Sequence, residues 1–154
     1  MFVSNVINRT INRDYLAEHE FESIKSGRTL DQIGKDIVDV AFTVHKHMGP
    51  GLNEAVYEEC LMKEFAKRKI PVKFQEPITI EYCGEPLDKY YVADLVVEGR
   101  VIVEIKSVAE LLPVHEAQLL NYLKLTDKEL GFLINFNVAL IKNGIRRRRN
   151  GYSE

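Results

Sequence analysis

The chain has 154 residues, of which 45% are hydrophobic and 29% are charged, and its formal net charge is −2. This length and composition fit one domain with a core of ordinary size. They exclude a membrane-spanning chain, because no apolar run approaches the ~20 residues that a spanning helix needs, and a nucleic-acid partner would have to be held by a local basic patch.

Residues 1–28 are polar and mixed in charge, and we interpret them as an N-terminal arm, either frayed or with a short helix over Asp14–Ser26. They contain no basic segment followed by an apolar stretch, as a secretory signal would. We therefore expect a cytoplasmic protein whose organised domain spans residues 29–154. In that compartment Cys60 and Cys83 are expected to be buried thiols, too few for a disulfide framework.

Two helices are predicted next. Apolar residues recur every three or four positions over Leu30–Met48, which predicts a helix with one buried face. Gly49-Pro50-Gly51 ends it. Asn53 is a suitable N-cap for a second helix, which ends before Pro71.

The pattern then changes to that of strands. Alternation over Val72–Tyr82 predicts a half-exposed strand, and residues 83–86 form a turn. Tyr90–Val97 and Val101–Lys106 are apolar on both faces and are joined by Glu98-Gly99-Arg100. We therefore expect both segments in the middle of a sheet.

The last third of the chain predicts a helix, a strand and an edge strand. The helix begins at Pro113 and runs to about Leu125. Its expected core contacts are Ala117, Leu119, Leu120 and Leu123. Gly131–Asn137 is an apolar strand, and Val138–Ile145 is expected to add an edge strand before a basic C-terminal tail. This order of elements predicts an α/β fold in which a central mixed sheet is flanked by helices.

Ionisable residues interrupt the two most apolar strands. A strand covered on both faces should not contain charges unless they are paired or bind something, yet Asp94, Glu104 and Lys106 lie in such strands. Side chains alternate along a strand, so Glu104 and Lys106 share a face. A three-residue loop using Gly99 would add Asp94 to that face. The sequence therefore predicts two carboxylates and an ammonium clustered on one side of the sheet.

Such a cluster suits a divalent cation. Two neighbouring carboxylates resist joint ionisation in apolar surroundings, and hard oxygen ligands suit Mg²⁺ or Mn²⁺. Lys106 would orient or deprotonate a water, or stabilise charge on a phosphate. The alternative is a buried ion pair without chemistry, in which Lys106 neutralises one carboxylate. Placement in two adjacent apolar strands favours a site.

The helices supply further candidates. Glu54 and Tyr57 lie one turn apart on the second helix, where Glu54 would equally well complement the positive helix N-terminus. On the later helix His115, Gln118 and Tyr122 form a polar stripe. Gln118 would either reach the carboxylate cluster or lie on a solvated helix edge.

Four segments, taken together, resemble the PD-(D/E)xK nuclease superfamily, and within it the family named after a GxxExxY motif. GLNEAVY at residues 51–57 spells that motif, and the resemblance covers about Leu30–Arg148. The segments are VHKHMGPGLNEAVYEECL, YVADLVVEGRVIVEIKSV, LLPVHEAQLLNYLKL and GFLINFNVALIKNGI. Ala93 departs from the pattern, since it stands where the superfamily's name has proline. The resemblance implies a restriction-endonuclease-like core and a nuclease-type site.

The resemblance carries roles to particular positions. Asp94 resembles the acidic residue of the second core strand, and Glu104 and Lys106 resemble the (D/E)xK of the third. Glu54 resembles a glutamate of the first core helix that completes the metal site. Gln118 resembles the glutamine of RecB-like members.

The function implied is Mg²⁺-dependent hydrolysis of phosphodiester bonds in DNA, or in RNA, with Mn²⁺ as a substitute. The expected metal-holding groups are Asp94, Glu104, the backbone carbonyl of Ile105, and Glu54, the last through a water or a second ion. Lys106 would position the attacking water. Tyr57 and Gln118 would orient these residues without binding the metal themselves.

Phosphate contacts are expected from two basic runs, although a terminal run also fits a solvated tail. Their residues are Lys67, Arg68, Lys69, Arg146, Arg147, Arg148 and Arg149. Two other functions stay open: a non-catalytic nucleic-acid- or protein-binding module that retains the nuclease fold, and a metal-stabilised structural protein. No membrane partner is expected, and an oligomer is compatible with the sequence.

Overall fold

The computed structural model describes residues 27–151, so the helix expected over Asp14–Ser26, and nearly all of the N-terminal arm, lie outside the described residues. The elements are α2 (Leu30–Met48), α3 (Glu54–Lys67), β1 (Val72–Tyr82), β2 (Glu85–Val97), β3 (Val101–Lys106), α4 (Pro113–Thr126), β4 (Leu130–Asn135), the 3₁₀ helix η1 (Ile141–Gly144) and β5 (Ile145–Arg149). The strands form one sheet in the order β1-β2-β3-β4-β5. Neighbouring strands are antiparallel except β3 and β4, which α4 connects as a parallel pair.

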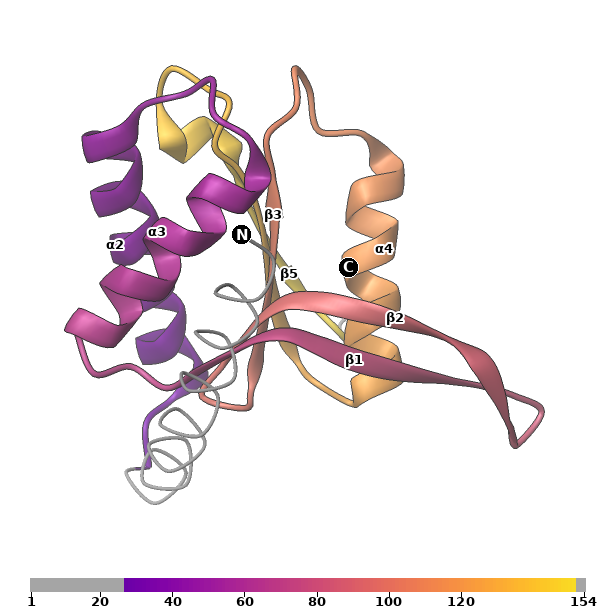
Figure 1. Ribbon diagram of the computed structural model, residues 1–154. Coiled ribbons are helices and arrows are strands. Elements are labelled where there is room, and N and C mark those ends of the chain that lie inside the picture. The colour runs from indigo at the N-terminus through magenta and orange to yellow at the C-terminus, as the bar shows by residue number, and fades with distance from the viewer. Residues whose placement is uncertain (1–26, 152–154) are drawn as a thin grey trace, which may run out of the picture.

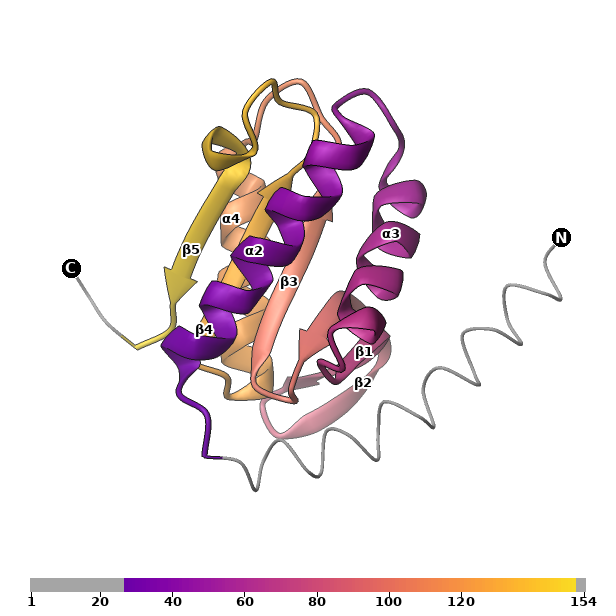
Figure 2. The same cartoon turned by 90° about the vertical axis from the view of Figure 1, so that its left-hand side faces the viewer.

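Helices cover both faces of the sheet. The α2 and α3 helices lie on one face and α4 lies on the other (Figures 1 and 2). This three-layer arrangement confirms the predicted α/β fold, a mixed sheet flanked by helices, and it matches a restriction-endonuclease-like core.

The first two helices begin and end where the sequence predicts. The side chain of Thr29 accepts a hydrogen bond from the Gln32 N–H at 3.2 Å, and the Gln32 side chain accepts one from the Thr29 N–H at 2.9 Å, which closes the N-terminus of α2. At its other end Gly49 has a φ of 67°. Asn53 caps α3 by accepting from the Val56 N–H at 3.1 Å.

The side chains of β3 alternate between two hydrophobic cores, one on each face of the sheet. Val103 and Ile105 pack in the larger core under α2 and α3. Ile102 packs in the smaller core under α4. Because side chains alternate along a strand, Glu104 and Lys106 point to the α4 side.

The hairpin β1–β2 extends beyond the sheet as a two-stranded arm (Figure 1). β3 pairs only with Leu95–Val97 of β2, so Tyr90 and Tyr91 remain 63% and 46% exposed. The prediction that all of Tyr90–Val97 lies in the middle of a sheet is therefore wrong for these two residues, because β3 is too short to cover them. Cys83, at the tip of the arm, is exposed, which corrects its prediction as a buried thiol.

The α4 helix begins at Pro113 as predicted. Its first turn is closed by His115, whose Nδ1 accepts a hydrogen bond from the Leu112 N–H at 3.0 Å. Leu119 and Leu123 are buried as expected, but Ala117 is exposed, and Tyr122 is buried on the inner side. The prediction of Ala117 as a core contact is wrong because the helix turns Tyr122 to the sheet.

The C-terminal arginines form the edge strand β5 rather than a tail. The predicted edge over Val138–Ile145 is a loop and the 3₁₀ helix η1, and the strand begins at Ile145. Successive arginines face opposite sides of the sheet and reach opposite helices. Arg146 and Arg148 contact Glu116 of α4 at 3.8 and 2.8 Å, and Arg147 and Arg149 contact Asp31 of α2 at 2.5 and 3.3 Å. These charges also discourage pairing of the edge with another chain.

Candidate active site

Asp94 and Glu104 meet where β2 and β3 separate. The ladder between these strands ends at the pair Leu95 and Val103. One residue further, the Glu104 carboxylate accepts from the Asp94 N–H at 3.2 Å, and the Asp94 carboxylate accepts from the Ile105 N–H at 2.8 Å. Each carboxylate thus lies against the other's strand. The predicted adjacency is confirmed, because exactly three turn residues separate β2 from β3.

The turn that sets this alignment is held by an ion pair to one buried carboxylate, Glu98, which sequence reasoning missed. Glu98 is 2% exposed, and the Arg28 guanidinium bridges it to Asp36. Arg100 donates to the Arg28 backbone carbonyl at 2.5 Å. Burial raises the pKa of Glu98, and Arg28 opposes that rise. No local sequence signal pairs Arg28 with a residue so far along the chain.

Glu104 is buried beside a second carboxylate. Its side chain is 4% exposed, and burial, followed by the charge of Asp94, raises its pKa from 4.5 to about 9. Lys106, on the same face and half-buried, lowers the pKa of Glu104 slightly. Within residues 27–151 Lys106 makes no ion pair with either carboxylate. The direct buried ion pair considered as an alternative is therefore not formed.

The α4 helix adds Tyr122 to this cluster, which sequence reasoning left out of the site. The Gln118 amide donates to the Tyr122 hydroxyl at 2.9 Å. Burial and then the charge of Glu104 raise the pKa of Tyr122 to about 12. Gln118 thus approaches the carboxylates through Tyr122. The four-residue spacing of the two on one helix was the available signal.

Glu54 and Tyr57 belong to α3, on the sheet face opposite the carboxylates. Glu54 is exposed at the start of α3, and among the described residues no group of three or more acidic, His or Cys side chains could hold a metal. Tyr57 is fully buried, and its ring stacks on Phe136 with centroids 4.6 Å apart. Its hydroxyl donates to the Gly49 carbonyl at 2.6 Å and accepts from the Leu52 N–H at 3.2 Å. Tyr57 therefore fastens the loop that precedes Glu54.

Replacing Tyr57 by phenylalanine is expected to lower the free energy of unfolding by about 1–3 kcal/mol, because the Leu52 N–H and the Gly49 carbonyl lose a buried partner. Urea unfolding followed by circular dichroism measures this. The matched control is Tyr82→Phe, since Tyr82 is 71% exposed and its change should alter stability by less than about 0.5 kcal/mol. Equal stability of the two variants would contradict the assigned hydroxyl contacts.

Only part of the second basic run lies on the sheet face that carries the carboxylates. Lys67 is the last residue of α3, which lies on the sheet face opposite α4. The run Lys67–Lys69 precedes Val72 of β1, which pairs with Val97, three residues along β2 from Asp94. Arg146 pairs with Leu133, which pairs with Glu104. Arg146 therefore lies on the α4 side, two strands or roughly 10 Å across the sheet from Glu104.

The fold and these carboxylates define a nuclease-like α/β domain in which a buried glutamate lies beside a half-buried aspartate. The chain matches the family model of the PD-(D/E)XK nuclease superfamily over residues 31–148, and it belongs to that superfamily. No curated protein and no solved structure matches it. In the part of the chain that the structure describes, no helix is long and apolar enough to cross a membrane.

The donor set fits the divalent metal that PD-(D/E)XK nucleases typically use. Asp94 and Glu104 present carboxylate oxygens side by side, which are hard ligands of the kind Mg²⁺ and Mn²⁺ prefer. Burial, and then the charge of Asp94, raise the pKa of Glu104, and a nearby cation would oppose both effects. Two carboxylates with waters complete such a site without a third acidic residue.

Proposed function

We propose that the protein is a metal-dependent nuclease that hydrolyses phosphodiester bonds in DNA, or in RNA. The observation that carries the proposal is the pair of the buried Glu104 and the half-buried Asp94, with Lys106 on the same face, in a domain of the PD-(D/E)XK superfamily. A buried carboxylate beside a second carboxylate is costly to a fold. A catalytic use accounts for that cost.

Asp94, Glu104 and the backbone carbonyl of Ile105 would hold Mg²⁺, or Mn²⁺ in its place. The bound ion supplies Lewis acidity toward the phosphate and toward water. Lys106 would orient the attacking water and hold positive charge near the phosphate. Gln118 would support the site by fixing the Tyr122 hydroxyl.

Glu54 would act only through a water or a second ion, because it is exposed and outside the carboxylate cluster. The GxxExxY motif at residues 51–57 and Gln118 support membership of the GxxExxY family and a RecB-like site. We also propose a cytoplasmic location.

Among the candidate phosphate contacts, Arg146 and Arg148 are favoured over Lys67, Arg68 and Lys69. The two arginines face the α4 side, where Glu104 lies. They contact Glu116, so a phosphate would have to compete with that carboxylate. Arg68 follows α3, which covers the other face of the sheet, and lies in an ion pair with Glu64.

The test is cleavage of single-stranded DNA, duplex DNA and RNA by purified protein with Mg²⁺ or Mn²⁺, compared with EDTA. Cleavage should require metal, and Lys106→Ala should reduce its rate about 100-fold or more, as for loss of a positioned catalytic group. The matched control is Lys63→Ala, since Lys63 is exposed on α3.

The outcomes separate the candidate functions. Binding of nucleic acid without cleavage would favour a non-catalytic module. Metal-dependent stability with neither binding nor cleavage would favour a metal-stabilised structural protein. Cleavage that Lys106→Ala and Lys63→Ala affect equally would contradict the assigned site.

A further inference from the structure

We infer that a cavity between β2 and α4 takes one unpaired base of the nucleic acid, next to the bond that is cut. The inference deepens the proposed function and rests on it. It concerns the side of α4 that faces the two-stranded arm.

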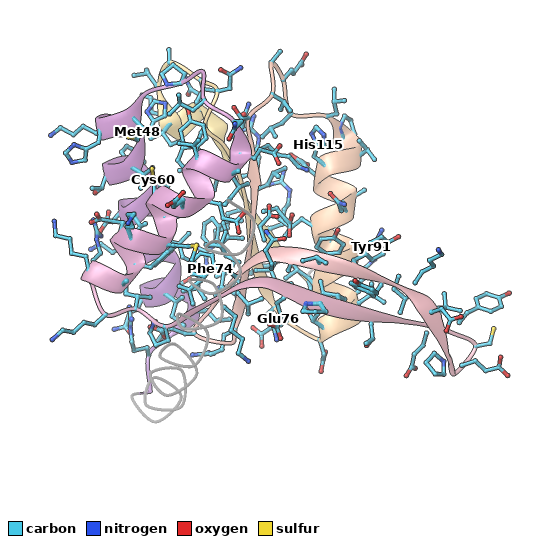
Figure 3. The ribbon with its side chains drawn as sticks, in the orientation of Figure 1. Met48, Cys60, Phe74, Glu76, Tyr91 and His115 are labelled. Carbon is cyan, nitrogen blue, oxygen red and sulfur yellow. The ribbon has the colours of Figure 1, made fainter. Side chains whose placement is uncertain are left out.

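The cavity has a volume of about 290 Å³, and its walls come from Tyr91 on β2 and from residues 114–122 of α4. Figure 3 shows Tyr91 on β2 beside α4 and His115 near the start of that helix. The Tyr91 ring lies 5.3 Å from the ring of Tyr122, tilted by 39°. Pockets for drug-sized ligands run to about 300–1,000 Å³, so this one suits a single ring system.

Tyr122 joins the cavity to the carboxylates. It lines the cavity and is 4% exposed, and it lies close enough to Glu104 and Asp94 for both charges to act on its hydroxyl. A group seated against Tyr91 therefore lies on the other side of Tyr122 from the proposed metal-holding pair. A base attached to a nucleotide at the cleaved bond would occupy this position.

The lining favours an uncharged planar group with a polar edge. None of the residues that line the cavity is Lys, Arg, Asp or Glu, which disfavours a phosphate. The half-exposed Tyr91 ring offers a stacking face. The amides of Gln118 and Asn121 offer donors and acceptors.

His115 adds a hydrogen-bond donor, because its contacts define the tautomer of its ring. Its Nδ1 accepts from the Leu112 N–H, so in the neutral ring Nε2 carries the proton. Stacking together with a few polar edge groups is how proteins hold splayed-out bases.

A base in this cavity must have left its duplex stack. The protein is therefore expected to prefer single strands or frayed ends over fully paired duplex. The carboxylate pair alone does not distinguish single-stranded from duplex substrate.

The test measures binding of a fluorescent single-stranded 12-mer and of the matching duplex in Ca²⁺, by anisotropy. Tyr91→Ala should weaken single-strand binding on the order of tenfold, since base–aromatic stacking contributes at that scale. Tyr90→Ala is the matched control, because Tyr90 is the adjacent residue, is more exposed and does not line the cavity; it should change binding less than twofold. Tyr91→Phe should bind as the wild type does.

A series of oligonucleotides, each with one abasic position, then identifies the seated base. One position should weaken binding to the wild type and should have little further effect on Tyr91→Ala. Equal binding by Tyr91→Ala and Tyr90→Ala, or equal affinity for duplex and single strand, overturns the inference while metal-dependent cleavage by the wild type sustains the proposed function. Absence of both binding and cleavage in the wild type overturns both.

Discussion

The Glu104→Gln variant is expected to lose metal-dependent cleavage and yet to be several kcal/mol more stable than the wild type at pH 8 in EDTA. The folded state holds the Glu104 proton up to about pH 9, whereas the unfolded chain releases it near 4.5. Between these values the folded state binds more protons, so wild-type stability falls as pH rises, by at most about 1.4 kcal/mol per pH unit. Glutamine cannot ionise and escapes this loss. Thermal melts at pH 5 and pH 8 measure both proteins.

Metal should reverse the order of stability of the wild type and the Glu104→Gln variant. Mn²⁺ is expected to raise the melting temperature of the wild type and to have little effect on Glu104→Gln, because a ligand that binds only the folded state stabilises it. The control is Glu81→Gln, since Glu81 is exposed on the arm and should follow the wild type throughout. A variant that is less stable than the wild type in EDTA at pH 8 would contradict a pKa of Glu104 raised by burial and by the charge of Asp94.

The adjacency of Asp94 and Glu104 could be predicted from sequence because it depends on local geometry alone. Side chains alternate with period two, and an odd turn keeps two residues on one face. The structure has that turn at residues 98–100. Helix ends were predictable for the same reason, since Asn53 and Gly49 act on the backbone next to them.

The parts that sequence reasoning missed depend on contacts between distant residues. Four consecutive arginines have no strand pattern, and β5 forms because β4 offers an edge and because Asp31 and Glu116 face its two sides. Tyr122 enters the site only because α4 turns that residue, rather than Ala117, to the sheet. The sequence predicts that Tyr91 lies in the middle of the sheet, because it does not show that β3 stops short of this residue.

Gly144 of η1 lies against the backbone of Asn135, at the end of β4. Gly144→Ala is therefore expected to lower the free energy of unfolding by about 3 kcal/mol or more. A Cβ there would lie 2.1 Å from the Asn135 backbone oxygen, which no side-chain rotation can relieve. Asn135 pairs with Lys106 in the sheet, and its amide donates to the Val108 carbonyl and accepts from the Val108 N–H. Displacing Asn135 should therefore also disturb the strand end that carries Lys106. Urea unfolding and the cleavage assay measure the two effects.

Gly131→Ala separates this backbone conflict from ordinary overpacking. Its Cβ would lie 2.7 Å from the Leu119 Cδ1, the far end of a side chain. Leu119 can rotate away, although it is buried, so we expect a loss of about 1–2 kcal/mol. Cleavage by Gly131→Ala should stay close to the wild type at a temperature where both are folded. If Gly144→Ala proves the milder substitution, the close approach of η1 to the end of β4 is wrong, and with it the support that we assign to Lys106.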